Sequence, residues 1–189
     1  MKKLITTTIL LFLLVTTTSL AADSSLASES LKPPTLSNSV NGLFPGLELT
    51  KDYLLYQYLE RMGYRVLSDN GQGYSYQLTK EFLLTYPGTL IWGVQSFDPT
   101  PYLGQIINVR KFIVINHPLD KHSEEGKTEV HVLVVNDIPL GGTSLPYSKE
   151  TLLGGFYSLD GRTIEQVLKI ANYTTEYPIW LKNWRQRFQ

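Results

Sequence analysis

Two runs of consecutive apolar residues place the strongest constraint on the fold of this chain. Phe112-Ile113-Val114-Ile115 lies within the segment Ile106–Asn116, and Val132-Leu133-Val134-Val135 lies within Glu129–Asn136. Successive side chains of a strand point to opposite faces, so consecutive apolar positions indicate burial on both faces. The two segments therefore predict central strands of a sheet, joined by the polar stretch His117–Lys127 as a long hairpin loop.

Helical patterns stand before and after these strands. Folded structure is expected to begin near Leu47, with a helix that Thr50 caps and Gly63 ends. One face of this helix carries Leu54, Leu55, Tyr58, Leu59 and Met62. Thr163 and Gln166 form a capping-box pattern that opens a helix through about Ala171. Pro178 suits the first position of a last amphipathic helix, 178–188. The order of elements predicts an α+β fold with a mainly antiparallel sheet of about 4–6 strands.

The segments between these elements are shorter. Two β-like runs, Tyr64–Ser68 and Tyr74–Leu78, flank Asp69-Asn70-Gly71, which carries the Asn-Gly signature of a tight hairpin. Thr79 is expected to cap a short helix over Lys80–Tyr86, whereas Thr89–Phe97 has no clean period and leaves helix and strand both open.

Turn residues separate the remaining elements. Asp98-Pro99-Thr100-Pro101 is expected to form a rigid turn, because each proline fixes its own φ angle and restricts the preceding residue. Gly141-Gly142 and Gly154-Gly155 indicate turns or bulges around further short strands.

Residues 1–22 have the three-part layout of a secretory signal peptide. Lys2 and Lys3 precede an apolar stretch, and Ser19-Leu20-Ala21-Ala22 supplies small residues for cleavage. Residues 23–46 are rich in serine and proline and predict a disordered tether, which leaves 47–189 as a single α+β domain. The protein is therefore expected to be secreted or held on the extracellular face of the cell envelope.

Composition excludes several function classes. The chain has no cysteine, so thiolate metal sites, disulfides and a thiol nucleophile are excluded. Its 17 basic and 17 acidic residues lack the basic excess of a nucleic-acid-binding protein, and no nucleic-acid partner is expected. No glycine-rich phosphate cradle occurs, and no cofactor is expected.

Three histidines are the main candidates for chemistry. His117, Asp120 and His122 lie in one loop and are a possible but weak ligand set for zinc or copper, with a solvated loop as the favoured interpretation. His131 lies within an apolar strand and is interpreted as a hydrogen-bonded histidine of the core or sheet edge. Asp98 joins the three loop residues as a candidate acid, base or ligand of a secreted hydrolase.

Two aromatic groups are candidate binding surfaces. Trp92, Gln95, Asp98 and Tyr102 surround the proline-fixed turn, and tryptophan and tyrosine often anchor interfaces. In the last helix the apolar face holds Trp180, Leu181, Trp184 and Phe188, with Lys182, Arg185 and Arg187 largely off it. Such a helix docks on its own domain, which we favour, or lies weakly on an anionic membrane or partner through Trp180, Trp184, Arg185 and Phe188.

Several short motifs resemble a known group of proteins as a set. They are Trp92-Gly-Val-Gln95, Asp98-Pro-Thr-Pro-Tyr102-x-Gly104, Asn116-His-Pro-Leu119, Gly141-Gly142 and Gly155-Phe-Tyr-Ser-Leu-Asp-Gly161. Together they resemble exported, functionally uncharacterised proteins of Gram-positive bacteria, and more distantly the domain of unknown function 4830 family. The resemblance covers about residues 80–165 and implies an exported α+β domain without implying a mechanism.

The expected function is that of a binding module. An exported domain with an aromatic cluster beside a rigid turn suggests a non-catalytic binding or accessory domain for an extracellular or envelope ligand. The alternative is a secreted hydrolase that acts on cell-wall or other extracellular polymer. The sequence leaves the ligand open.

Overall fold

The computed structural model describes residues 51–150 and 156–189. The predicted signal peptide and tether, the cap at Thr50 and the pair Gly154-Gly155 lie outside the described residues. The strands are β1 (Arg65–Gln77), β2 (Ile106–Ile115), β3 (Thr128–Val135), β4 (Ile138–Pro146) and β5 (Tyr157–Ser158). The helices are α1 (Lys51–Arg61), α2 (Lys80–Leu84), α3 (Gly88–Gly93), α4 (Ile164–Leu168) and α5 (Tyr173–Phe188), with 3-10 turns η1 (Thr100–Tyr102) and η2 (Asp120–His122).

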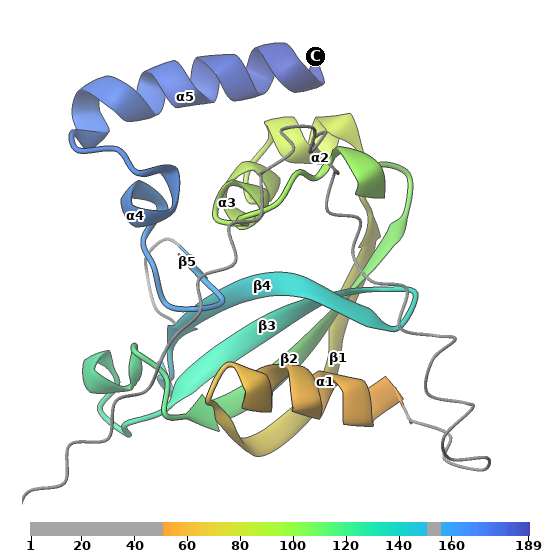
Figure 1. The fold of residues 1–189 in the computed structure, drawn as a ribbon, viewed down its shortest axis with the longest axis vertical. Helices are drawn as coiled ribbons and strands as arrows, with labels where there is room; N and C mark the ends of the chain where they lie inside the picture. Colours follow the sequence, from red (N-terminus) through yellow and green to blue (C-terminus); the bar gives the residue numbers. More distant parts are fainter. Residues whose placement is uncertain (1–50, 151–155) are drawn as a thin grey trace, which may run out of the picture. The chain divides into compact units, whose positions relative to one another are not determined.

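The strands form one antiparallel sheet in the order β1-β2-β3-β4-β5 (Figure 1). Helix α1 precedes the sheet in the chain, and α4 and α5 follow it. The predicted α+β class and the predicted strand number are therefore confirmed. The long loop between β2 and β3, which contains η2, is also where the sequence places it.

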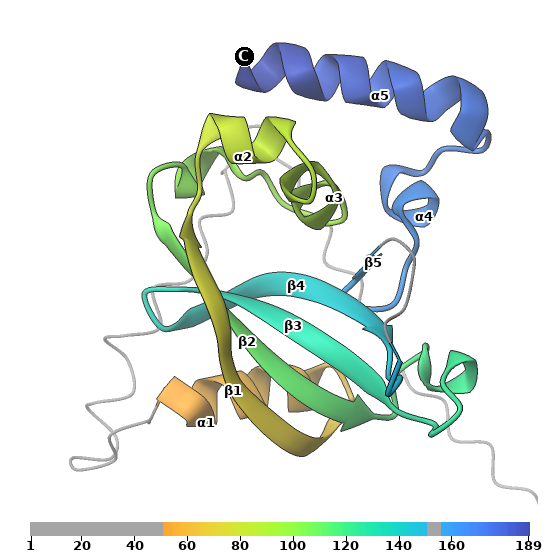
Figure 2. The same cartoon turned by 180° about the vertical axis from the view of Figure 1, so that it is seen from behind.

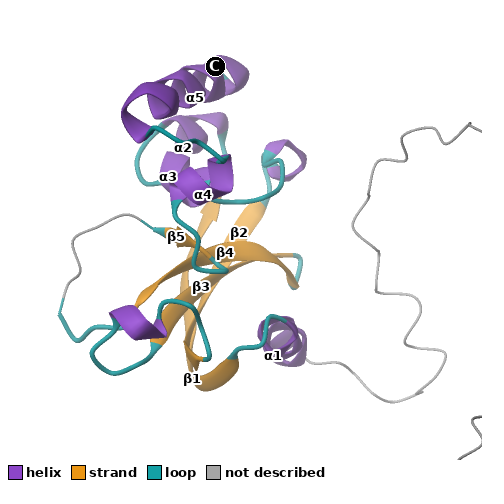
Figure 3. Cartoon of the chain, turned by 60° about the vertical axis from the view of Figure 1, so that its left-hand side comes forward, coloured by secondary structure: helices purple, strands orange, loops and turns teal. Residues whose placement is uncertain are grey.

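The two apolar runs form β2 and β3, which are buried on both faces. Figure 3 shows α1 on one side of the sheet and α2, α3 and α5 on the other. Even-numbered side chains of the two strands face α1 and pack with Leu55 and Leu59: Phe112, Val114, Val130, Val132 and Val134. Odd-numbered ones pack with the other helices: Ile107, Val109, Leu133 and Val135. Consecutive apolar residues thus supply two hydrophobic clusters: the first cluster lies on the face that α1 covers, and the second cluster lies on the opposite face.

Helix α1 closes the first cluster as predicted. Leu55 and Leu59 are buried, while Gly63 follows the helix with a φ of +86°, a conformation that favours glycine. Arg110 of β2 joins the helix to the sheet, because its guanidinium pairs with Asp52 of α1 at 2.8 Å and with Asp69 of β1 at 2.6 Å.

The predicted hairpin at Asp69-Asn70-Gly71 is wrong, because β1 runs through it as one long strand at the edge of the sheet (Figure 2). Both β-like runs pair with β2, and the extra residues between them are absorbed by register shifts around Asp69 and Gln72. The tight turn of this sheet is Asn136-Asp137 instead. Both residues have positive φ, as in a two-residue type I′ hairpin that joins β3 to β4.

The first part of the segment Thr89–Phe97, which the sequence left open, is helical, and residues 94–97 are neither helix nor strand. Thr79 caps α2 by accepting a hydrogen bond from the Phe82 amide, as predicted, and Thr89 to Gly93 belong to α3. This short helix buries Ile91 and Trp92 against the second cluster. Asp98 accepts hydrogen bonds from the Thr100 amide and hydroxyl, which fixes the predicted rigid turn at η1.

The two helices after the sheet begin at polar caps. The capping box of Thr163 and Gln166 is present in α4, although the helix ends at Leu168 rather than near Ala171. Helix α5 begins at Tyr173 and not at Pro178, because the Asn172 side chain accepts a hydrogen bond from the Thr175 amide. Pro178 lies inside the helix, five residues beyond its first residue.

Candidate functional site

Trp92 of the predicted aromatic surface lies in the core. Its side chain is 1% exposed, and its indole N–H donates to the Tyr76 hydroxyl at 3.0 Å. Its ring packs against Phe97 and the half-buried Tyr102, with centroids 6.1 and 6.3 Å away. The geometry of α3 turns this tryptophan toward the sheet, so its direct role is to fill the second cluster.

Gln95 occupies the outer edge of β4. Its amide nitrogen donates to the Gly142 carbonyl at 3.0 Å, and its amide oxygen accepts from the Gly142 N–H at 3.0 Å. The same nitrogen also donates to the Ile91 carbonyl at 2.6 Å. Strand β5 pairs with β4 only at Thr143 and Ser144, so the Gln95 amide takes the place of a neighbouring strand at Gly142.

Asp98 connects the proline-fixed turn to α5. One oxygen serves the turn, and the other pairs with the Arg187 guanidinium at 2.6 Å. Burial alone would raise the pKa of Asp98, but the hydrogen bonds from Thr100 and Arg187 and the charge of Arg187 outweigh it, so the pKa is lowered. Of the four residues at this predicted surface, Asp98 is the one most open to solvent.

The aromatic face of α5 docks on the rest of the domain. The Trp184 indole N–H donates to the Leu83 carbonyl of α2 at 2.8 Å, and Phe188 is 2% exposed within the second cluster. Trp180 lies against Gly93 of α3, where a β-carbon would stand 2.9 Å from the indole ring. Arg185 stays exposed. Of the two arrangements that the sequence allowed, the structure therefore shows the docked one.

The loop histidine His117 is a buried structural group. Its Nε2 donates to the Leu159 carbonyl at 3.0 Å, while its Nδ1 accepts from the Leu119 amide at 3.1 Å. This pairing describes a neutral imidazole with the proton on Nε2. Burial lowers the pKa of His117 below its usual value, against the opposing effects of the Leu159 carbonyl, Asp120 and Asp160.

Its two loop neighbours do not join it in a cluster of ligands. Asp120 accepts hydrogen bonds from the His117 backbone amide at 3.0 Å and from the Thr128 hydroxyl at 2.7 Å, and His122 is exposed in η2. Within residues 51–150 and 156–189, no three histidine or carboxylate side chains are grouped so that they could hold a metal ion. His131 is hydrogen-bonded to Glu129 on the same strand, as its place in an apolar strand predicts.

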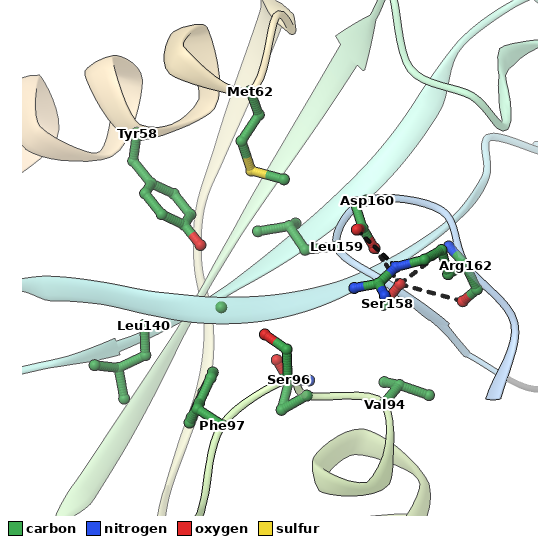
Figure 4. Close-up of a pocket in the computed structure, with 12 residues that line it drawn as sticks. Tyr58, Met62, Val94, Ser96, Phe97, Leu140, Ser158, Leu159, Asp160 and Arg162 are labelled. Carbon is green, nitrogen blue, oxygen red and sulfur yellow. Dashed lines mark hydrogen bonds and ion pairs between the residues drawn. The ribbon is translucent and has the colours of Figure 1, made fainter. Parts of the chain in front are cut away.

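A pocket of about 110 Å³ opens between four parts of the domain, and sequence reasoning missed it (Figure 4). Helix α1, the segment after α3, strand β4 and the turn after β5 all contribute to it. Its lining consists of Tyr58, Met62, Val94, Gln95, Ser96, Phe97, Leu140, Gly141, Ser158, Leu159, Asp160 and Arg162. Gln95 alone among the predicted site residues reaches this pocket. Residues from such distant segments carry no shared spacing in the sequence; the one local signal was the charged turn Asp160-Gly161-Arg162.

The turn after β5 gives the pocket its charge. Gly161 has a φ of +79°, which lets the chain reverse so that the Arg162 Nε donates to the Asp160 carboxylate at 2.8 Å. The Ser158 hydroxyl donates to the other carboxylate oxygen. Burial raises the pKa of Asp160, yet the hydrogen bonds from Arg162 and Ser158 outweigh it and lower the pKa overall.

Tyr58 supplies a neutral hydroxyl on the opposite wall. Burial of its ring, followed by the negative charge of Asp160, raises the pKa of Tyr58 above its ordinary value. The hydroxyl therefore keeps its proton at neutral pH and can donate a hydrogen bond. Apolar side chains line the pocket between these two walls: Met62, Val94, Phe97, Leu140 and Leu159.

Comparisons with family models, with curated protein sequences and with solved structures find no match to this chain. None of the helices in the described part of the chain is both long and apolar enough to cross a membrane.

Proposed function

We propose that this protein is an exported, non-catalytic binding domain of the extracellular space or cell envelope, and that the pocket beside Arg162 is its ligand site. Export rests on the signal-peptide pattern of residues 1–22 and on the resemblance to exported Gram-positive proteins. Binding rests on the pocket, where polar groups from α1, the segment after α3 and the turn after β5 converge beside apolar side chains.

The single observation that carries the proposal is the state of the Arg162 guanidinium. Only its Nε is engaged, by Asp160, and within residues 51–150 and 156–189 its two terminal nitrogens make no hydrogen bond. Figure 4 shows this group directed into the pocket. The Arg162 side chain is 43% exposed, so a ligand that accepts hydrogen bonds would take the place of water at these nitrogens.

The acids and histidines that the hydrolase alternative would use lie outside the pocket. Asp98 belongs to the η1 turn, and His117, Asp120 and His122 belong to the loop between β2 and β3. None of the four lines the pocket.

Binding is tested by nuclear magnetic resonance on the isotope-labelled mature protein. A set of acids, amines, amides and alcohols of up to about six heavy atoms should include compounds that shift the backbone amides of Ser96, Gly141 and Leu159. Ser96→Trp should block these shifts because it fills the mouth of the pocket, whereas Asn183→Trp on the exposed face of α5 should leave them unchanged. If no compound moves the pocket resonances, the proposal fails.

Export is tested separately by intact-mass measurement of culture supernatant and envelope fractions. We expect a mature chain that begins near Ala22 or Asp23. Full-length protein confined to the cytoplasm would contradict the export half of the proposal.

A further inference from the structure

Two of the groups that line the pocket, the Arg162 guanidinium and the Tyr58 hydroxyl, can donate hydrogen bonds to a ligand. A guanidinium carries five N–H groups, and Asp160 engages only the one on Nε of Arg162. The four N–H groups on the terminal nitrogens form a planar fork that matches the two oxygens of a carboxylate. Across the pocket the Tyr58 hydroxyl, which keeps its proton, points toward the same space (Figure 4).

The Asp160 carboxylate beside Arg162 already has two hydrogen-bond partners. Asp160 accepts from Ser158 with one oxygen and from Arg162 with the other, so its carboxylate has strong partners on both sides. Its lowered pKa keeps it ionised, so the 2.8 Å ion pair, whose side chains are 43% and 42% exposed, favours this orientation of Arg162. A positioned guanidinium loses less freedom on binding than a mobile one.

The size and lining of the pocket restrict what enters. A volume of about 110 Å³ is well below that of a typical drug-sized site. Only a terminal group of a ligand fits, and Met62, Phe97 and Leu140 provide apolar contact for a short hydrocarbon stem.

We propose that the pocket binds a carboxylate carried on a short apolar stem, with Arg162 and Tyr58 as the donors. The inference rests on the proposed binding function and names its ligand class. Two sources present the same chemistry: a free short-chain carboxylic acid, and the carboxyl terminus of a peptide with a small apolar last residue.

The test measures dissociation constants by the same resonance shifts for matched probes. Butanoate is compared with butanamide, which has the same shape and no charge; N-acetylalanine is compared with its amide; inorganic phosphate is the third arm. Each acid should bind at least about tenfold more tightly than its amide, the effect of one charge-assisted hydrogen bond pair. The tighter of the two acids identifies the source.

Three variants assign the donors. Tyr58→Phe keeps the ring and removes the hydroxyl, and Arg162→Lys keeps the charge and removes the fork; each should weaken butanoate several-fold and leave butanamide nearly unchanged. Arg65→Lys, an exposed change on β1 outside the pocket, should alter neither. Unchanged melting temperatures show that the first two variants still fold.

Distinct failures separate this inference from the function on which it rests. Equal affinity for acid and amide, or tighter binding of phosphate, would overturn the carboxylate assignment while pocket binding stood. If neither Tyr58→Phe nor Arg162→Lys weakened the binding of butanoate, the roles of Arg162 and Tyr58 as donors would be overturned. If no probe moved the pocket resonances, both the inference and the proposed site would fail.

Discussion

Replacing Gln95 with alanine separates a structural role for this residue from a role in surface recognition. Its amide makes three hydrogen bonds, two of them to the backbone of Gly142 on the edge of β4. Gly142 is buried, so water does not readily replace the lost partner. A buried donor or acceptor left without a partner costs about 1–3 kcal/mol, and on Gly142 alone the substitution leaves one of each.

The expected loss in free energy of unfolding is therefore about 2–5 kcal/mol. Because whole domains are stable by only about 5–15 kcal/mol, such a loss is large. Urea unfolding followed by tryptophan fluorescence measures it as a lower midpoint at constant slope. Gln77→Ala is the matched control, since the exposed Gln77 amide makes a single bond to the Gly104 carbonyl, and it should cost less than about 1 kcal/mol.

Gln95→Glu adds a test of the bonding pattern. A carboxylate can still accept from the Gly142 N–H, but it faces the Gly142 and Ile91 carbonyls without a proton to donate. Its deficit relative to the wild type should therefore shrink as the pH falls from 7 toward 5 and the carboxylate takes up a proton. A Gln95→Ala variant within about 0.5 kcal/mol of the wild type would refute the edge-pairing role.

Three further predictions concern the core and the buried histidine. Trp184→Ala should destabilise the domain by about 3–5 kcal/mol in urea unfolding, because the Trp184 indole is docked on α2. The control Ile179→Ala, at an exposed position of α5, should cost little. A near-neutral Trp184 variant that lost binding to anionic vesicles would favour a membrane role. Val132→Ala in the first cluster should lower the free energy of unfolding by about 2–4 kcal/mol, and Ile138→Ala at an exposed position should lower it by less than about 0.5 kcal/mol. Equal effects of the two variants would contradict the assignment of β3 as a central strand. Burial lowers the pKa of His117, so the unfolded chain binds a proton more readily than the folded one. The free energy of unfolding should therefore fall as the pH drops below about 6.5, by at most about 1.4 kcal/mol per pH unit. His117→Gln should flatten this slope in thermal unfolding measured between about pH 7 and 5.

The sequence predicted those parts of the fold that depend on residues close together in the chain. The apolar runs around Ile113 and Val132 gave both central strands, because burial on two faces leaves a pattern within each strand. The Thr163 capping box gave the start of α4 for the same reason. The Asn70-Gly71 turn failed because pairing of β1 with β2 across the whole strand outweighs a local turn preference, so Gly71 takes its positive φ inside the strand.

The candidate site was harder to predict because it depends on distant segments. Tyr58, Ser96, Leu140 and Arg162 come together only after α1, β4 and the turn after β5 have packed, and no spacing between them announces this. The aromatic group around Trp92 was conspicuous in the sequence, but its tryptophan points into the core. Residue type alone does not distinguish a tryptophan that anchors an interface from one that fills a cluster.

The docking of α5 also has a consequence for how this chain is made. Trp184 donates to the carbonyl of Leu83, a residue 101 positions earlier, and Phe188 belongs to the same cluster. At about 5–20 residues per second, a ribosome needs roughly 5–20 s to synthesise the intervening chain. During that time the apolar side chains of α2 and α3 lack their cover, while the cluster under α1 already has all its residues by Leu159. The nascent chain therefore presents one half-closed apolar face to chaperones during its synthesis.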